Sequence, residues 1–490
     1  MFNSPLPLSR RARRTTVLLA TVAVAAAGLS ACTPGDNSGC EGGKTEITLS
    51  GPNQWTSSGS TFGPAWEALV AAFEEEEACV TLKTNVLPLD SFYSTLSTQL
   101  AAGNATELVF GASTHEPQMI YALNDDLEKP NPYIEGNERW IDAFNPEYFT
   151  IEKVANSEGG VESIPFNLVG VALFYNQDAF ADAGVDTPPE TFEEFIAACD
   201  ALTEAGYTPY SMDNGNLGTG WTIGALTAQF LGGDLADQWN VYDAAGEPGS
   251  ADPLAAKSIA RAMATGEFSA DLPEVQQALE QTKRMWDHCV SPDWSGTAST
   301  SGAIVGAEQF MAGDAAIAIG VNFGVAELDD VTFEVGSMPF PTITKETSKL
   351  SPGLPARFGT GLGGTSYSIP STVEGKKLEY AIKFLQFVSS PEHITPWLAT
   401  SGGIPVLADV EPPANVAGFL DGDWAKPFRV GYGILQTPST TTNTNAFGGY
   451  LLGSKDLAQQ VADLQALYDE RVLEDARNHP EWAGEDWYQG

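Results

Sequence analysis

The chain has 490 residues, 43% of them hydrophobic, and a formal net charge of −40 from 24 Lys and Arg against 64 Asp and Glu. This length exceeds what one hydrophobic core usually supports, so we expect a folded protein with two domains. The strongly negative charge excludes nucleic acid and anionic lipid surfaces as partners, because both require positive patches. Neutral ligands are therefore expected.

Residues 1–31 have the pattern of an export signal: an arginine-rich start, an apolar run at 16–28, and then Leu29-Ser30-Ala31-Cys32. That tetrad resembles the bacterial lipobox, in which the cysteine is lipidated and becomes the first residue. Residues 32–43 would form a polar tether behind it. Removing 1–31 takes away four arginines and no acid, so the mature charge is −44 (20 Lys and Arg against 64 Asp and Glu). An arginine pair in the signal leaves both the general and the twin-arginine export routes open.

The mature chain carries four further cysteines, Cys40, Cys79, Cys199 and Cys289. An even number in an exported chain indicates two disulfides. Cys40 and Cys79 each precede an expected strand, which favours pairing them if the strands are parallel neighbours. The other two then pair by default. Because no CxxC or HxxxH spacing occurs, we expect no metal site.

Strands and helices alternate at the start of the mature chain, which predicts a parallel, doubly wound sheet. The expected elements are strand 45–50, helix 63–76, strand 80–87, helix 89–102 and strand 107–111. Ligands bind such sheets beyond the carboxyl ends of the strands. That rule selects loop 51–60, with Asn53 and Trp55, and loop 112–117, with His115 and Glu116. Polar groups beside an indole suit a ligand with many hydroxyl groups.

The stretch 164–176 marks the entry into a second domain. Pro165 disfavours a helical conformation at Ile164, and the run 168–175 is apolar and uncharged, as in a buried strand. We expect the ligand to lie in the cleft between the domains. Later expected elements are helix 191–205, loop 212–220 leading to Trp221, helices 224–231 and 272–287, strand 315–321, strand 366–370, helix 376–389 and helix 456–476. Proline-rich segments at 338–354 and 404–413 predict two more passages between domains.

Three segments of the chain resemble the extracellular solute-binding proteins of bacterial ABC importers, in particular their carbohydrate-binding group. They are IPFN…LFYNQDAFADAGV at 164–185, FMAGDAAIAIG at 310–320, and AIKFLQFV…GGIPV at 381–406. The resemblance implies a type II periplasmic-binding-protein-like α/β fold, with two domains whose sheets are mostly parallel and three crossovers between them. Domain one would comprise 44–166 and 354–406, and domain two 167–353 and 407–490.

The resemblance also implies a set of ligand contacts. Aromatic platforms would be Trp221 and Phe323, with Phe447 or Tyr450 from a late loop at 437–450. Asn167 would be a polar contact at the first crossover, and Gly363 and Gly364 would let the backbone approach the ligand. His115 and Glu116 occupy a loop that is often polar in the family.

The expected function is capture of a sugar or oligosaccharide and its delivery to the membrane permease of an ABC importer. The protein would be a monomer, held on the outer face of the cytoplasmic membrane by a lipid on Cys32, without a cofactor. A glycoside-acting enzyme is an alternative, in which Glu116 and Asp213 would be the paired carboxylates. A scaffold or adhesin without a small ligand is another. No GxSxG, P-loop or HExxH motif supports an enzyme.

Overall fold

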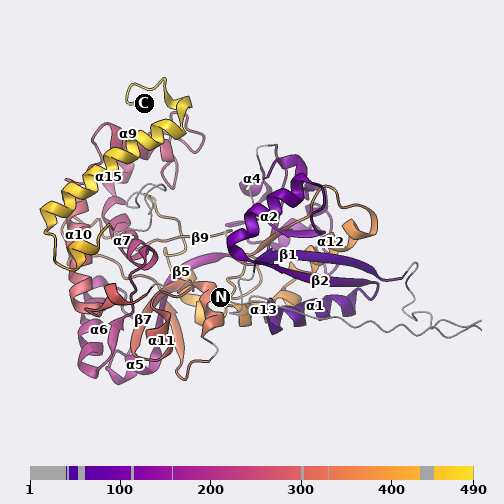
Figure 1. The fold of residues 1–490 in the computed structure, drawn as a ribbon, viewed down its shortest axis with the longest axis horizontal. Coiled ribbons are helices and arrows are strands. Elements are labelled where there is room, and N and C mark those ends of the chain that lie inside the picture. Colours follow the sequence, from indigo (N-terminus) through magenta and orange to yellow (C-terminus); the bar gives the residue numbers. More distant parts are fainter. Residues whose placement is uncertain are drawn as a thin grey trace, which may run out of the picture.

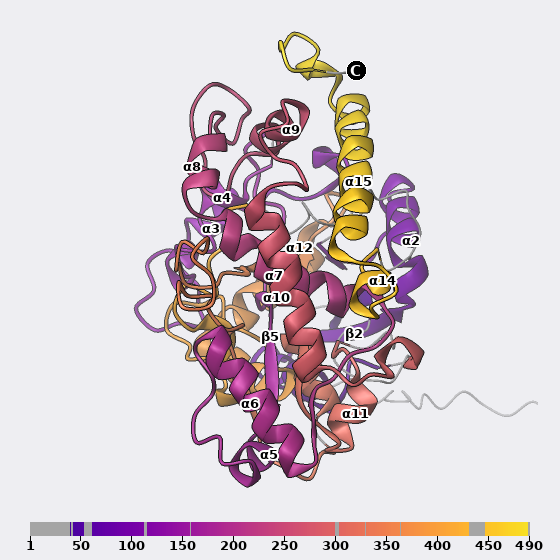
Figure 2. The ribbon, with the colours of Figure 1, turned by 90° about the vertical axis from the view of Figure 1, so that its left-hand side faces the viewer.

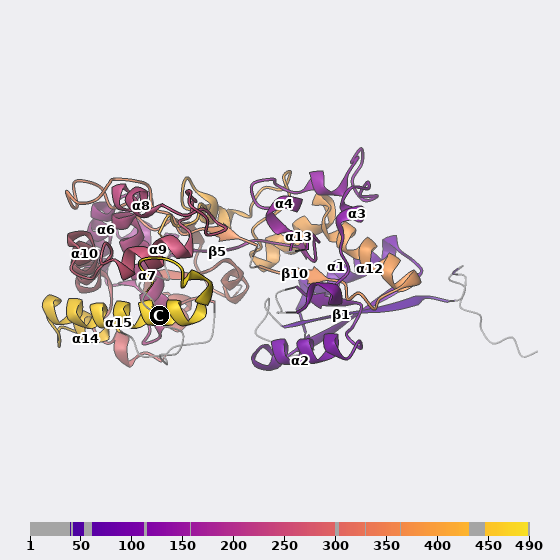
Figure 3. The same cartoon turned by 90° about the horizontal axis from the view of Figure 1, so that it is seen from above.

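A computed structural model describes residues 40, 43–52, 61–111, 115–156, 158–298, 303–328, 330–362, 364–430 and 446–488. The chain forms two lobes that lie side by side along the long axis of the molecule (Figures 1 and 3). Each lobe contains one β-sheet with helices around it. Within these residues, no helix combines the length and apolar character needed to span a bilayer.

The first lobe is built on a five-stranded sheet in the order β2-β1-β3-β10-β4. Its strands are β1 (Thr45–Pro52), β2 (Val80–Leu87), β3 (Leu108–Phe110), β4 (Ile164–Pro165) and β10 (Ser366–Ser368). The helices of this lobe are α1 (Pro64–Glu76), α2 (Leu89–Ala101), α3 (Asn124–Leu127), α4 (Ile151–Val154), α12 (Gly375–Val388) and α13 (Pro391–Ser401), with 3-10 turns η1 (Pro117–Met119) and η2 (Trp140–Ala143). Trp66 on α1 is fully buried among rings of α12, α13 and the first passage, and its indole N–H donates to Thr84 Oγ1 at 2.8 Å.

The second lobe is built on a sheet in the order β6-β7-β5-β8, with β9 paired to β5 outside that path. Its strands are β5 (Val169–Asn176), β6 (Thr208–Tyr210), β7 (Ala315–Val321), β8 (Val335–Met338) and β9 (Thr360–Gly361). Its main helices are α6 (Phe192–Ala205), α7 (Asn216–Leu231), α10 (Pro273–Cys289) and α15 (Leu457–Asn478), which cover the near side of the lobe in Figure 2. Shorter elements are α5 (Gln177–Asp182), α8 (Asp234–Trp239), α9 (Ala256–Ala264), α11 (Ala307–Met311), α14 (Gly448–Leu451), and the 3-10 turns η3 (Trp294–Gly296), η4 (Asn322–Glu327), η5 (Ala414–Leu420) and η7 (Pro480–Trp482).

The α/β class with two sheets is confirmed, but the sheets are mixed rather than mostly parallel. β1 pairs in parallel with β2 and β3, whereas β10 is antiparallel to β3 and β4. In the second sheet β5 is antiparallel to β7 and β8. The reason lies in the crossovers. A strand that enters a lobe from the other lobe starts at their boundary and runs away from it, opposite to the strands that end there.

One expected loop is helical. A loop was expected at 212–220, but α7 already begins at Asn216. The glycine content of this stretch disfavours a helix by propensity, and tertiary packing outweighs it. A Cβ added to Gly218 would lie 2.5 Å from Val305 Cγ1, so the glycine is required for close approach of the two segments.

Both expected disulfides form, Cys40–Cys79 and Cys199–Cys289. The first links the start of β1 to the start of β2, whose strands pair in parallel register from Thr45 and Val80. The second ties the α6 helix to the end of α10. The strands of each sheet come from the segments that the sequence analysis assigned to one domain, apart from β9. The domain boundaries themselves stay a prediction.

Candidate ligand-binding site

Three passages of the chain between the lobes lie side by side. The first, which runs from β4 into β5, is in the middle. On one side, Phe166 N–H donates to Thr365 O at 2.8 Å, and Val169 of β5 pairs with Gly361 of β9. On the other side, Leu168 N–H donates to Ile404 O, also at 2.8 Å. The segment that pairs with the first passage includes Thr360–Gly361 and Thr365, and Ala356 before it belongs to the core of the second lobe. The expected passage at 338–354 stays a prediction.

Asn322, which directly follows β7, joins two of these passages through hydrogen bonds. We call the three passages and the side chains that join them the hinge. Its side chain is fully buried, and Oδ1 accepts from Gly170 N–H at 3.0 Å. Its Nδ2 donates to Gly402 O at 2.9 Å and to Leu168 O at 3.3 Å. One amide thus satisfies three backbone groups on two different passages. Because buried backbone groups are costly to leave unpaired, this amide fixes where the passages meet.

Asn167 has a similar place in the hinge. Its side chain is 2% exposed, and Oδ1 accepts from Thr365 N–H at 2.6 Å, which ties the first passage to the second. Gly364 packs directly on it, since an added Cβ would lie 2.6 Å from Asn167 O. The close backbone approach expected at Gly364 therefore exists, but toward Asn167. Gly363 lies outside the described residues. Contact of Asn167 or Gly364 with a ligand stays a prediction.

In the first lobe, the carboxyl ends of β1 and β3 point toward the passages. Asn53 and Trp55, expected just after β1, lie outside the described residues. His115, after β3, has a side chain that is 8% exposed, with Nε2 at 3.7 Å from Glu162 Oε2. Glu162 is in turn held by Asn156 Nδ2, which donates to its Oε1 at 2.5 Å. Glu116 is exposed to solvent. His115 is thus a fixed polar group in this part of the first lobe.

In the second lobe, Trp221 belongs to a cluster of rings. Trp221 on α7 meets Phe358 edge-on, with centroids 6.4 Å apart. Phe358 in turn lies 5.4 Å from Trp424 and 5.0 Å from Phe428. Phe358 directly precedes the second passage, and its N–H donates to Trp424 O at 3.0 Å. The ring cluster, defined as Trp221, Phe358, Trp424 and Phe428, is therefore connected to the hinge by backbone hydrogen bonds.

The other expected platforms, like Trp221, pack in or against the core of the second lobe. Phe323, in η4 next to Asn322, is half-buried against the core of the second lobe. Phe447 and Tyr450 are buried in that core. Burial raises the pKa of Tyr450 to about 12, with smaller contributions from Glu280 and Asp287 of α10. These positions stay predictions as ligand contacts.

A comparison with protein families decides the class of the protein. Residues 56–394 match the model of the family described as bacterial extracellular solute-binding protein. The chain belongs to this family. The fold and the three interlobe passages agree with that membership, because a binding protein of two lobes needs a connection that allows them to move.

Curated binding proteins are similar to this chain in sequence over part of its length. The sn-glycerol-3-phosphate-binding periplasmic protein UgpB of Salmonella typhimurium is 24% identical over 285 residues, covering 56% of this chain and 54% of UgpB. This chain spans only about a third to a half of the length of the curated relatives that it matches (34% to 54%).

Solved structures match over nearly the whole of their chains. A chitin oligosaccharide binding protein has a TM-score of 0.56 at 19% identity, with 88% of this chain and 99% of that one covered. A probable secreted solute-binding lipoprotein from Streptomyces coelicolor has a TM-score of 0.57 at 19% identity, with 86% and 98% covered. At this identity these structures establish the fold.

Asp213, one of the two carboxylates of the enzyme alternative, holds two backbone segments together. It is 3% exposed, and it accepts from Gly215 N–H at 2.8 Å and Gly306 N–H at 3.5 Å. These bonds hold the loop after β6 against the loop before α11. No group of three or more His, Cys, Asp or Glu in the described part of the chain is arranged to hold a metal ion.

Sequence patterns do not identify Asn322 as a hinge residue, or Phe358, Trp424 and Phe428 as partners of Trp221. Asn322 directly follows β7, a position at which an asparagine is equally compatible with a turn. The three aromatic residues lie in segments without periodicity. The only signal was the position of Phe358 just before the glycine-rich stretch 359–364.

Proposed function

We propose that this protein captures a carbohydrate between its two lobes and delivers it to the membrane subunits of an ABC importer. The observation that carries the proposal is the hinge, in which three passages are joined by hydrogen bonds beside the ring cluster. Sugar C–H faces pack on aromatic rings, and sugar hydroxyls require polar partners. Closure of the lobes can be driven only by the difference in ligand affinity between the open and closed forms.

Two of the matched proteins support a ligand of this kind. The chitin oligosaccharide binding protein has the fold of this chain, and so does a raffinose-bound solute-binding protein, RafE, with a TM-score of 0.51. UgpB is named for a small polyol phosphate. A molecule with several hydroxyl groups is the common chemistry of these ligands. The position of Trp221 in the ring cluster makes it our first candidate for a stacking platform.

We also propose that Cys32 carries the lipid that holds the protein on the outer face of the cytoplasmic membrane. The diacylglycerol expected at a lipobox supplies two acyl chains, which anchor stably where one chain would not. Metabolic labelling with a fatty acid tests this point. Incorporation that is lost in Cys32→Ser, together with release of the protein from the membrane fraction, is expected. A labelled Cys32→Ser protein would contradict it.

A thermal-shift screen of residues 33–490 tests the function. Mono- and oligosaccharides, polyols and glycosides are the ligands, followed by calorimetry of those that stabilise the protein. A binder raises the melting temperature through mass action and leaves the ligand intact. An enzyme would consume the ligand, and a scaffold would respond to none. The absence of any stabilising sugar would refute the proposal.

A further inference from the structure

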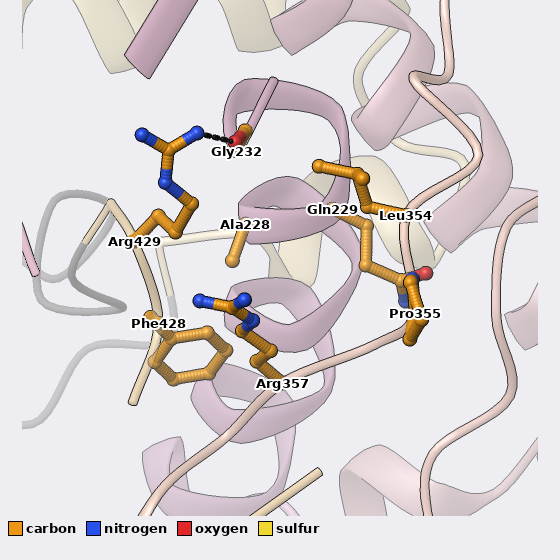
Figure 4. A pocket seen from close by; sticks show the side chains of 8 residues that line it. All are labelled: Ala228, Gln229, Gly232, Leu354, Pro355, Arg357, Phe428 and Arg429. Atoms are coloured by element: carbon orange, nitrogen blue, oxygen red, sulfur yellow. Dashed lines mark hydrogen bonds between the residues drawn. The ribbon is translucent and has the colours of Figure 1, made fainter. Parts of the chain in front are cut away.

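A pocket in the second lobe adjoins the ring cluster and contains two guanidinium groups. It lies between the C-terminal half of α7 and two segments of the chain, 354–357 and 428–429 (Figure 4). Arg357 and Arg429 line it together with Phe428, which is itself a member of the ring cluster. Only seven arginines follow Arg14 in the sequence, and two of them line this one pocket.

The two arginines differ in how far their hydrogen-bonding capacity is used. Arg429 Nη1 donates to Gly232 O at 2.8 Å, at the end of α7, and Nη2 donates to Asp237 at 2.6 Å. Among the described residues, the carboxylates that Arg357 contacts lie at long distances, 3.5 Å for Asp423 and 3.7 Å for Asp252. Asp423 already accepts from Lys426 at 2.7 Å. Arg357 therefore retains donors for another acceptor.

Asp252 shows that one oxyanion can face both guanidinium groups. Its Oδ2 is 3.7 Å from Arg357 Nη1 and its Oδ1 is 4.0 Å from Arg429 Nε. Both distances exceed that of a hydrogen bond. The Asp252 side chain is 60% exposed, so solvent screens it and little holds it in place. A ligand oxyanion bound closer to the guanidiniums would gain charge-assisted bonds that Asp252 does not make.

We propose that this pocket binds an oxyanion, a carboxylate or a phosphate, carried by the ligand. The inference rests on the proposed function in one respect: a sugar stacked at the ring cluster would project its charged substituent past Phe428 toward Arg357. The preferred ligands are then acidic sugars or sugar phosphates rather than their neutral parents. Asp252 occupies the place of the oxyanion when no ligand is bound and competes with it.

Calorimetry with matched ligand pairs in a phosphate-free buffer of low ionic strength tests the pocket. Each pair consists of a sugar with its uronate, or a sugar or polyol with its phosphate, and inorganic phosphate and sulfate are measured alone. We expect the anionic member to bind at least tenfold tighter than the neutral one. Arg357→Gln should remove that preference. Arg357→Lys, which keeps the positive charge but not the planar guanidinium with its two parallel N–H donors, should restore part of it. Asp252→Asn should strengthen anion binding.

Arg261→Gln is the matched control, because Arg261 is 26% exposed against 25% for Arg357 and its partner Glu267 lies outside the pocket. It should leave every affinity unchanged. Equal binding of both members of each pair, or a preference that survives Arg357→Gln, would overturn the pocket while leaving sugar capture intact. Failure of all sugars with Arg357-dependent binding of phosphate or sulfate would instead refute sugar capture and keep the pocket. No Arg357-dependent binding of any anion refutes the pocket outright.

Discussion

Replacing Asn322 by alanine should weaken the connection between the lobes more than any other single polar change in the described hinge. The substitution removes three hydrogen bonds, to Gly170 N, Gly402 O and Leu168 O. Each is worth about 1 kcal/mol net, and each backbone group left buried and unpaired adds to the loss. The contact to Leu168 is the longest, at 3.3 Å, and contributes least. We therefore expect a loss of about 3 to 4 kcal/mol in the free energy of unfolding.

Urea unfolding followed by tryptophan fluorescence measures this loss, and calorimetry with a stabilising sugar measures its effect on binding. Asn131→Ala is the matched control. Asn131 is 1% exposed and makes two comparable bonds, to Gln386 O at 2.8 Å and from Tyr133 N–H at 3.0 Å, within the first lobe. It should destabilise that lobe without changing sugar affinity, whereas Asn322→Ala should change both. A loss below 1 kcal/mol for Asn322→Ala would refute the assignment of this residue to the hinge.

Trp221→Ala should weaken sugar binding tenfold or more, on a stacking contribution of roughly 1.5 kcal/mol, while Trp482→Ala, equally buried at 9% exposure in the C-terminal segment, should not; equal effects in calorimetry would remove Trp221 from the site. Burial holds the pKa of Tyr450 at about 12 in the folded state, against about 10 in the unfolded chain. The contribution of the buried neutral phenol to the free energy of unfolding is therefore complete below pH 10 and is lost as the pH rises toward 12. Tyr450→Phe should therefore reduce the alkaline fall in the urea midpoint, and an unchanged slope would contradict this. Replacing Cys199 and Cys289 together by serine opens a loop between residues 90 apart and should cost roughly 4 kcal/mol in urea unfolding; a loss under 1 kcal/mol would show that the disulfide adds little.

The sequence predicted the elements whose patterns are decided locally. The stripe Trp66, Leu69, Val70 and Phe73 is buried on α1, as its spacing of three and four residues requires. Strand 315–321 is β7 at the expected bounds, with every residue buried. Disulfide pairing followed from the parallel register of β1 and β2.

The rest depends on contacts between distant segments. α7 begins earlier than expected because Gly218 packs against Val305, which no local pattern reveals. α8 and α9 are short and gave no expected element. Asn322 is a hinge residue because of where its amide points, and an asparagine after a strand is equally compatible with a turn. Arg357 and Arg429 are 72 positions apart in the sequence, and they line the same pocket because both of their segments pack beside α7.

The central claim is that a sugar binds between the lobes and closes them. Small-angle X-ray scattering of residues 33–490, titrated with a sugar that stabilises the protein, tests it most directly. The account predicts a radius of gyration that falls with sugar concentration and saturates at the calorimetric stoichiometry, with a smaller fall in Asn322→Ala. Saturating sugar that leaves the radius of gyration unchanged would contradict closure of the lobes on the ligand.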